Sequence, residues 1–222
     1  SFITDAAAGD GNLKMFRLSS ILYHILAVWL AFLCLSLLGV NRLYSFLLSL
    51  VLLAHPAVTQ AVAWIPGRND ILLAVFILAS FYWFLRFLDT GKPGPFALHA
   101  LFWFGGLLTK ETAVVLPVLL LPAAWILRKG SARRILPLLS IWVILFFAWF
   151  FIRSSVISQQ GIPAGNLLAS LWQNLPALLP FLGKSVFPVG LSVFPVLTDM
   201  TLNAWLGVVA MGVLIAIAVL HR

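Results

Sequence analysis

Apolar and polar residues occur along this chain in long blocks rather than in alternation. The apolar blocks are separated by short segments that contain charged residues, Gly or Pro. A helix needs about 20 apolar residues to cross roughly 30 Å of hydrocarbon, whereas the strands of a membrane barrel alternate polar and apolar positions. The pattern therefore predicts an all-α protein, a polytopic transmembrane helical bundle of about seven to eight spans, some of them short or re-entrant.

The blocks divide the chain into two regions. Residues 1–18 are polar and Gly-rich and are expected to form a loop outside the bilayer, on the periplasmic or lumenal side, followed by a transmembrane domain over residues 19–222. A stretch broken by five prolines, residues 161–200, is expected to cross the membrane, to be re-entrant or to lie along the outer surface. The other predicted spans are residues 19–39, 43–65, 71–88, 96–109, 112–127, 135–152 and 202–220.

Composition agrees with a membrane protein and excludes several other classes. Of the residues, 63% are hydrophobic and 9% are charged. The single cysteine, Cys34, excludes an intrachain disulfide and a Cys-based zinc site. The net charge of +8 matches anionic lipid headgroups, so no nucleic-acid partner is predicted. The chain begins without Met and ends directly after an apolar block, so it is expected to be a piece of a longer protein.

Lys and Arg are unevenly distributed between the two sides of the predicted bundle. If the spans alternate, the loops of one side contain Asp89 together with Arg42, Arg86, Lys92, Arg128, Lys129, Arg133 and Arg134. The loops of the other side contain Lys14, Arg17, Arg68, Lys110 and Arg153 together with Asp5, Asp10, Asp70 and Glu111. Short cytoplasmic loops are enriched in Lys and Arg, so the first side is predicted to be cytoplasmic. A multi-pass location in the bacterial inner membrane is expected, in preference to the endoplasmic reticulum.

Lys110 and Glu111 lie between two short apolar blocks and are therefore expected below the outer membrane surface. As a helix, residues 96–109 would extend only about 21 Å, at a rise of about 1.5 Å per residue. A lysine at this depth is costly unless it faces a wet cavity or an anion, which favours a functional role. The alternative is a structural ion pair between Lys110 and the adjacent Glu111 at a helical hairpin.

A second polar interruption on the outer side is HPAVTQAVAWIPGRND, residues 55–70. Pro56 removes a backbone donor, so the helix is predicted to break at His55 and to resume as a short helix. Arg68 and His55 are both interpreted as residues with a functional role, in preference to a structural role at the membrane edge. Asp70 or the preceding Asn69 is expected to cap the next helix.

Isolated cations and histidines on the outer side suit a phosphate group held at membrane depth. Arg68 supplies a bidentate fork and Lys110 a point charge, and His24 and His55 are expected to line the same outward-facing cavity. No metal or cofactor is predicted, because no span contains a pair of His or carboxylate residues at helical spacing. His99 is expected at the cytoplasmic membrane interface.

Several of these segments occur in an order that resembles one family. The matches are residues 16–24, His55-Pro56, residues 61–65, Gly67-Arg68, residues 108–117 around Lys110-Glu111, and residues 182–192. Together they resemble the transmembrane-and-tetratricopeptide-repeat family of protein O-mannosyltransferases and its bacterial relatives.

The resemblance implies that the chain is part of the core of a C-type glycosyltransferase. Such an enzyme takes a mannose-like sugar from a polyprenyl-phosphate donor and transfers it, with inversion, to a hydroxyl of an acceptor protein or glycan. The implied partners are the lipid-linked donor, the acceptor and membrane lipids. The implied donor-phosphate site consists of His24, His55, Arg68, Lys110 and Glu111, with Asp70 beside it.

The chain departs from the family pattern at residues that would perform the chemistry. The family has a Glu where Gln60 stands and an acidic residue in its first outer loop that serves as base. Asp5 and Asp10 are the acids of that loop here and are the candidates for this role. The family's first helix would precede Ser1, and its repeats would follow Arg222.

Two other functions stay open beside the transferase. The first is a non-catalytic membrane subunit that retains this fold. It is supported by Gln60, which replaces the family's Glu, and by Asp5 and Asp10, neither of which belongs to a paired-carboxylate motif. A carrier or flippase for lipid-linked sugars would use the same phosphate-binding groups, although no inverted pair of interrupted helices is evident.

Overall fold

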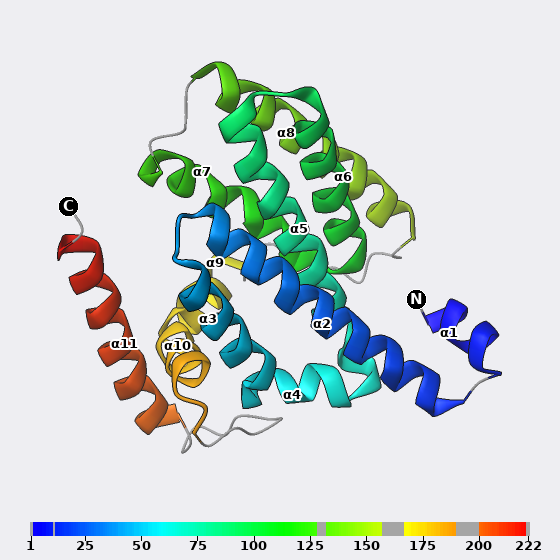
Figure 1. Cartoon of the computed structure of the whole chain (residues 1–222), viewed down its shortest axis with the longest axis horizontal. Helices are drawn as coiled ribbons and strands as arrows, with labels where there is room; N and C mark the ends of the chain where they lie inside the picture. The colour runs from blue at the N-terminus through cyan, green and yellow to red at the C-terminus, as the bar shows by residue number, and fades with distance from the viewer. Residues whose placement is uncertain (1, 11, 128–131, 157–166, 190–199, 221–222) are drawn as a thin grey trace. The chain divides into compact units, whose positions relative to one another are not determined.

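The computed structural model describes residues 2–10, 12–127, 132–156, 167–189 and 200–220 (Figure 1). Every regular element in these ranges is a helix, which confirms the predicted all-α class. The chain divides into two compact units: residues 1–54 with 61–158, and residues 55–60 with 159–222.

The first unit contains most of the long helices. Its elements are α1 (Phe2–Gly9), α2 (Leu13–Leu37), α3 (Arg42–Ala54), η1 (Ile65–Gly67), α5 (Arg68–Thr90), α6 (Pro93–Thr109), η2 (Glu111–Val115), α7 (Leu116–Ile126) and α8 (Ala132–Val156). Helix α4 (Pro56–Ala63) begins in the second unit. The other elements of the second unit are α9 (Leu167–Asn174), η4 (Leu175–Ala177), α10 (Leu178–Val186) and α11 (Met200–Leu220).

Within the described residues, three helical stretches are long and apolar enough to cross a membrane: Leu13–Leu37, Ile65–Thr90 and Arg133–Val156. Helices α3 and α4 would add a fourth span if they are counted as one. Helix α6 has 17 residues, about 25 Å at about 1.5 Å per residue, and is short for a crossing. The helices thus fit a membrane bundle, and the expected seven to eight spans remain a prediction.

The N-terminal region differs from its prediction, because helix replaces the loop expected over residues 1–18. Residues 2–9 form α1, in which three consecutive alanines provide the strongest helix propensity. Helix α2 then begins at Leu13, where the Asn12 side chain accepts a hydrogen bond from the Lys14 N–H at 3.0 Å. That bond satisfies a donor that the helix itself leaves unpaired, so α2 begins earlier than its apolar block.

The segment between α3 and α5 confirms one prediction and overturns another. Helix α3 ends at Ala54 and α4 begins at Pro56, as expected from the missing proline donor. The Ala57 N–H donates instead to His55 Nδ1 at 3.3 Å. The prediction of an Asp70 or Asn69 cap is wrong, because Gly67 precedes the helix and caps it without a side-chain bond. The η1 turn leads directly into α5, and Asp70 lies in its first turn.

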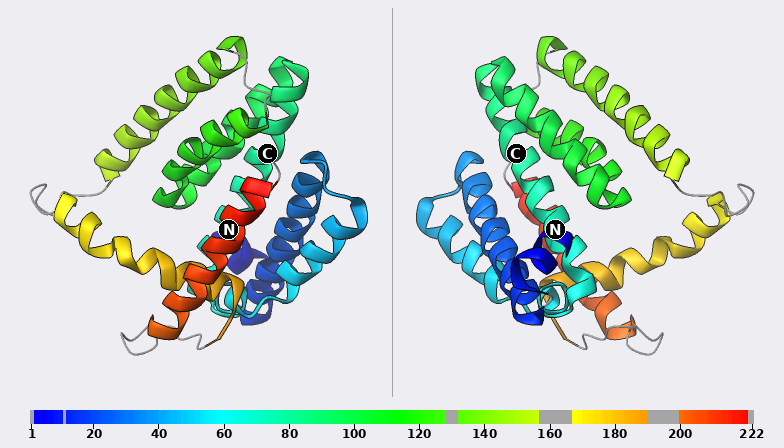
Figure 2. Two further views of the ribbon diagram at one scale, coloured as in Figure 1. Left: turned by 90° about the vertical axis from the view of Figure 1, so that its left-hand side faces the viewer. Right: turned by 90° about the vertical axis from the view of Figure 1, so that its right-hand side faces the viewer.

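Helix α5 is the centre of the first unit (Figure 1). Helix α2 lies parallel to it, since Ser20 contacts Arg68 and Cys34 contacts Leu78 further along both helices. Helix α6 runs antiparallel to α5 after Gly91, whose φ of 65° ends α5 in the left-handed conformation. Figure 2 shows α3 returning beside α2. The largest buried cluster joins α5 to α8 and includes Phe84, Leu88, Trp103, Leu107, Leu116, Leu120, Leu138 and Trp142.

His99 is completely buried inside the first unit, and its expected position at the membrane interface stays a prediction. Its Nδ1 donates to the Ser80 carbonyl at 3.0 Å, and its Nε2 accepts a hydrogen bond from Trp142 Nε1 at 2.8 Å. The ring therefore contributes one donor and one acceptor, as a neutral imidazole does. Through these bonds His99 connects α6 to both α5 and α8.

The second unit is organised by a close helix crossing. A Cβ added to Gly183 of α10 would lie 2.0 Å from the Asn203 carbonyl oxygen of α11. One added to Gly207 of α11 would lie 1.9 Å from the Leu179 carbonyl oxygen. Both glycines thus permit backbone-to-backbone contact. Residues 161–166 and 190–199 of the Pro-broken region lie outside the described residues.

Candidate functional site

Ion pairs from four parts of the chain gather at one end of the first unit. Arg68 pairs with Asp5, Lys110 with Asp70, and Arg153 with Glu111. They come from α1, the start of α5, the junction of α6 with η2, and the end of α8. At the other end of α5, Arg134 donates to the Leu88 carbonyl. The charged residues at each end of α5 are ones that the alternating spans place on the same side of the membrane. Which of the two sides is cytoplasmic remains a prediction.

Arg68 is completely buried and uses its guanidinium within the protein. Its Nε donates to Ser20 Oγ at 3.2 Å, its Nη1 donates to Asp5, and its Nη2 donates to the Phe16 carbonyl. The guanidinium carbon also lies 4.7 Å from the ring centroid of Phe2 and 5.5 Å from that of Phe16. These contacts fix α1 and the start of α2 to the start of α5.

Asp5, one of the two predicted base candidates, is the anionic half of this pair. The carboxylate accepts from Arg68 and, at 2.9 Å, from Ser19 Oγ, and the residue is 7% exposed. Both carboxylate oxygens of Asp5 are thus occupied by donors of the chain itself. Asp10, the other candidate, follows α1 with a φ of 50° and lies exposed.

His24 has a structural contact that accounts for its burial. Its Nε2 donates to the Leu53 carbonyl at 3.1 Å, next to the end of α3. In an unbroken helix that carbonyl would accept from Ala57, whose N–H is occupied by His55. His24 therefore satisfies a backbone acceptor that the break at Pro56 leaves without its helical partner.

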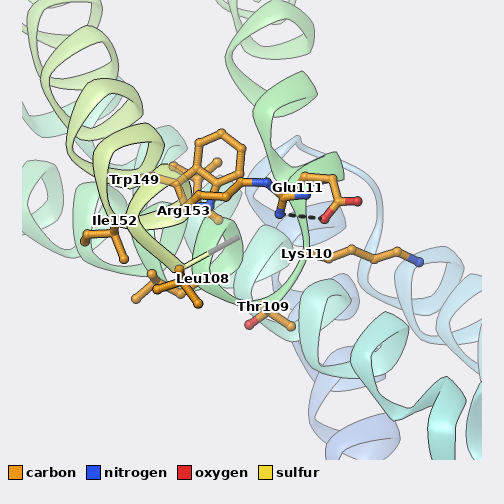
Figure 3. A pocket seen from close by; sticks show the side chains of 9 residues that line it. Leu108, Thr109, Lys110, Glu111, Trp149, Ile152 and Arg153 are labelled. Atoms are coloured by element: carbon orange, nitrogen blue, oxygen red, sulfur yellow. Dashed lines mark hydrogen bonds and ion pairs between the residues drawn. The ribbon is translucent and has the colours of Figure 1, made fainter. Parts of the chain in front are cut away.

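Lys110 ends α6 in an extended conformation, with a φ of −157°. Its ammonium group donates to Asp70, and the two side chains are 38% and 52% exposed. The sequence alternative of a pair between Lys110 and Glu111 is not what the structure contains (Figure 3). An exposed pair of this kind exchanges readily with solvent or with a ligand.

Glu111 and Arg153 form the neighbouring pair. Arg153 Nη1 donates to Glu111 Oε2 at 3.2 Å, and the guanidinium carbon lies 5.4 Å from the Trp149 ring centroid. Figure 3 shows the guanidinium of Arg153 beside that ring and directed toward Glu111. The backbone N–H of Glu111 itself, together with Arg153 and Lys110, lowers the pKa of its carboxyl group, so the charged form is favoured.

These charged groups line an open pocket of about 210 Å³ (Figure 3). Its walls are the end of α6, Lys110, Glu111 and the last turns of α8. A second hollow, of about 270 Å³, is lined almost entirely by apolar side chains of α6, α7 and α8, among them Trp103, Pro117, Leu121, Val143 and Phe146. The ring centroids of Phe146 in this groove and Trp149 in the pocket are 5.9 Å apart. The charged pocket thus adjoins an apolar groove along one face of α8.

The structure brings together only some of the predicted site residues. Lys110 and Glu111 share the pocket and Asp70 contacts its lysine, whereas Arg68 and His24 have their polar contacts elsewhere in the first unit. His55 and Gln60 belong to the second unit. The described residues contain no group of three His, Cys, Asp or Glu side chains placed to hold a metal ion.

Arg153 is the residue that the sequence analysis missed, since it was counted only among the outer basic residues. The available signal was its position at the end of an apolar block on the same side as Glu111.

The fold and this site define a helical membrane protein whose paired charges line a pocket beside an apolar groove. The chain is similar to three curated proteins: it is 30% identical over 114 residues to Protein O-mannosyl-transferase Tmtc1 of Drosophila melanogaster, and 33% identical over 104 residues to Protein O-mannosyl-transferase TMTC1 of both mouse and human. No family model matches the chain. No solved structure matches it either.

The similarity covers part of each protein. It extends over 51% of this chain for the fly protein and 42% for each mammalian protein. The matched region is only 13%, 11% and 12% of the fly, mouse and human proteins. The comparisons therefore support the family resemblance in this region. All three relatives are animal proteins, so they give no support to the expected bacterial membrane.

Proposed function

We propose that the chain is part of a membrane glycosyltransferase that transfers a mannose-like sugar from a polyprenyl-phosphate donor to a protein hydroxyl, with inversion. The observation that carries this proposal is the pocket of Lys110, Glu111 and Arg153 beside an apolar groove, in a chain similar to proteins named O-mannosyl-transferases. A phosphate with a long hydrocarbon tail needs cations around the phosphate and an apolar groove for the tail, next to each other.

In the proposed reaction Lys110 and Arg153 act on the donor phosphate. Negative charge accumulates on this phosphate as the sugar departs, and cations already in position stabilise that charge in the transition state. Asp70 keeps Lys110 at the pocket through their ion pair. The expected role of His55 as a phosphate ligand stays a prediction, because His55 belongs to the second unit.

Arg68 and His24 are proposed to contribute indirectly. Arg68 holds α1 through Asp5, and His24 holds the end of α3 through the Leu53 carbonyl. Their loss would therefore alter the surroundings of the site rather than remove a donor contact.

Transfer by the full-length protein in proteoliposomes tests this proposal. The probe is polyprenyl-phosphate mannose with a radiolabelled sugar, offered with a Ser- and Thr-rich acceptor protein. We expect label on the protein, attached to a hydroxyl with an anomeric configuration opposite to that of the donor. Absence of both transfer and release of mannose by a folded protein would overturn the proposal.

A non-catalytic membrane subunit is the second candidate, and one observation favours it. Arg68, Lys110 and Arg153 each pair with a carboxylate of the chain, as in a structural network. In this case the protein would bind polyprenyl phosphate weakly or not at all, and substitution of Lys110 would leave its complexes unchanged.

A further inference from the structure

The turn that presents Lys110 and Glu111 to the pocket is folded back onto α6. Lys110 follows the last residue of α6, and its N–H donates to the Gly106 carbonyl at 3.0 Å. The Lys110 carbonyl in turn accepts from the Ala113 N–H at 3.1 Å, so the chain reverses around Glu111. Two side chains that pair with different helices, α5 and α8, are therefore presented by one tight turn.

Ala113 is the residue that fixes this turn to α6. It is 1% exposed, and a Cβ added to Gly106 would lie 3.4 Å from the Ala113 methyl carbon, so α6 and η2 pack closely at this point. The Ala113 carbonyl accepts from the Leu116 N–H and from Trp103 Nε1, the latter at 2.9 Å. The bond from Leu116 is local to η2, whereas the bond from Trp103 joins η2 to α6.

Trp103 belongs to the largest buried cluster of the first unit and also lines the apolar groove. An indole has a single polar group, the Nε1–H donor. Burial in the cluster accounts for an aromatic ring at this position, but the N–H has a separate effect. Its acceptor lies in the turn that contains Lys110, so one buried hydrogen bond connects the floor of the groove to the charged pocket.

We propose that Trp103 is a positioning residue of the transfer, whose N–H holds the turn on α6 and thereby keeps Lys110 in place for the donor phosphate. This inference rests on the proposed function. A cation stabilises developing charge most effectively when it is in position beforehand, and a misplacement of about 1 Å can cost about 100-fold in rate. Trp103 does not touch the phosphate and acts through Lys110.

Hydrogen–deuterium exchange of the purified full-length protein in detergent tests whether the bond holds the turn. Trp103→Phe removes the N–H and keeps a ring in the buried cluster. The Ala113 carbonyl retains the Leu116 N–H, so the variant is expected to fold. The amides of residues 111–116 should exchange about fivefold faster than in the wild-type protein, as expected on loss of one ordinary hydrogen bond. Unchanged exchange in this segment overturns the proposal.

His99→Ala is the matched control. His99 lies on α6 one turn before Trp103 and is completely buried, but its hydrogen bonds join α6 to α5 and α8 and not to η2. The substitution should lower stability and leave the exchange of residues 111–116 unchanged. Equal acceleration in His99→Ala and Trp103→Phe would show a general loosening of α6 and would overturn the assignment.

Transfer from polyprenyl-phosphate mannose by the full-length protein in proteoliposomes tests the connection to Lys110. Below the melting temperature of each variant, Trp103→Phe should lower kcat about tenfold, while the KM for the donor stays within about threefold. In a Lys110→Ala background the same substitution should lower kcat less than about twofold, because the bond acts through the lysine.

Two kinetic results would contradict this role of Trp103. One is an unchanged kcat in Trp103→Phe, and the other is an equal fall in kcat with and without Lys110. A wild-type protein that neither releases nor transfers mannose instead overturns the proposed function, so the two failures are distinguishable.

Discussion

Arg68 and Asp5 form a buried ion pair that joins α5 to α1, with the arginine side chain completely inaccessible and the aspartate side chain 9% exposed. Ser20, Phe16 and Phe2 complete the surroundings of the guanidinium. Removal of one partner from such a pair leaves a buried charge without compensation. The sequence suggests Arg68 as a phosphate ligand, but in the structure its role is to fix α1 to the start of α5.

Loss of either partner should destabilise the protein. We expect Asp5→Asn and Arg68→Gln each to lower the free energy of unfolding by about 3–5 kcal/mol, the usual cost of breaking a buried pair. Denaturation of the purified protein in detergent, followed by helical circular dichroism, measures this change.

Asp10→Asn is the matched control for this prediction. Asp10 is exposed and has a φ of 50°, a conformation that asparagine tolerates as well as aspartate. Its stability should equal that of the wild-type protein. Equal stability of Asp5→Asn and the wild-type protein would contradict the structural role of the pair.

The buried hydrogen bond between Trp142 and His99 should also stabilise the fold. Trp142→Phe leaves a buried His99 Nε2 without its donor, and His99→Ala leaves the Trp142 N–H without its acceptor. Each change is expected to cost about 1–3 kcal/mol of unfolding free energy, the penalty of an unsatisfied buried polar group.

A double-mutant cycle on these two residues separates the hydrogen bond from the change in packing. The two effects should be less than additive. Trp125→Phe is the control, because Trp125 is 74% exposed and its loss should not matter. Strict additivity of His99→Ala and Trp142→Phe would show that the bond contributes no coupling energy.

Much of the helical fold could be predicted from the sequence, because apolar blocks and prolines act locally. The break at His55 follows from the missing donor of Pro56, and α6 begins at Pro93 because a fixed φ suits the first turn of a helix. Helix α1 was missed because a polar, Gly-containing composition suggested a loop. Its helix depends on alanine propensity and on the anchoring of Asp5 by Arg68.

The partners of the charged residues could not be predicted in this way. Arg68 and Asp5 are 63 positions apart, Lys110 and Asp70 are 40 apart, and Arg153 and Glu111 are 42 apart. Which acid meets which base depends on how helices pack, and periodicity contains no such information. Proximity in the sequence favoured Lys110 with Glu111, and tertiary packing separated them.

The crossing of α10 and α11 should depend on its two glycines. We expect Gly183→Ala and Gly207→Ala to separate the helices, since each added Cβ would lie about 2 Å from a backbone oxygen. Leu179 faces Gly207 and Asn203 faces Gly183, so a flexible bismaleimide that joins cysteines at Leu179 and Asn203, in a background without Cys34, measures how close the helices lie. Gly212→Ala is the control, because nothing lies within 4 Å of its added Cβ. Undiminished cross-linking in the Gly183→Ala protein would contradict this packing.

The two ends of the first unit should face opposite sides of the membrane. Lys14 precedes the outer ion pairs and Lys92 lies between α5 and α6, and both are exposed. A membrane-impermeant maleimide added outside intact cells should label Lys14→Cys and not Lys92→Cys, because basic loops stay in the cytoplasm. The native Cys34 is buried and should give little background. Outside labelling of Lys92→Cys would reverse the predicted orientation.

Substitutions of Arg68 and of Lys110 should differ in their effects on stability and on transfer, because Arg68 is buried and Lys110 is partly exposed. Arg68→Ala is expected to lose activity in step with its melting temperature. Lys110→Ala should unfold almost like the wild-type protein, since an exposed ion pair contributes about 0–1 kcal/mol. Its transfer rate should nevertheless fall roughly ten- to a hundred-fold, because a charge-assisted contact to phosphate is worth about 1.5–3 kcal/mol.

Two further variants distinguish the charge of Lys110 from its contact with Asp70. Lys110→Arg should recover part of the rate, because a planar guanidinium replaces the charge but not the compact shape of the ammonium group. Asp70→Asn should have a milder effect than Lys110→Ala, because it removes the partner and leaves the cation. The measurement is the transfer rate of each full-length variant from polyprenyl-phosphate mannose, plotted against its melting temperature. If Lys110→Ala retains wild-type turnover, or loses it only in proportion to stability, the lysine belongs to the structural network and not to the donor site.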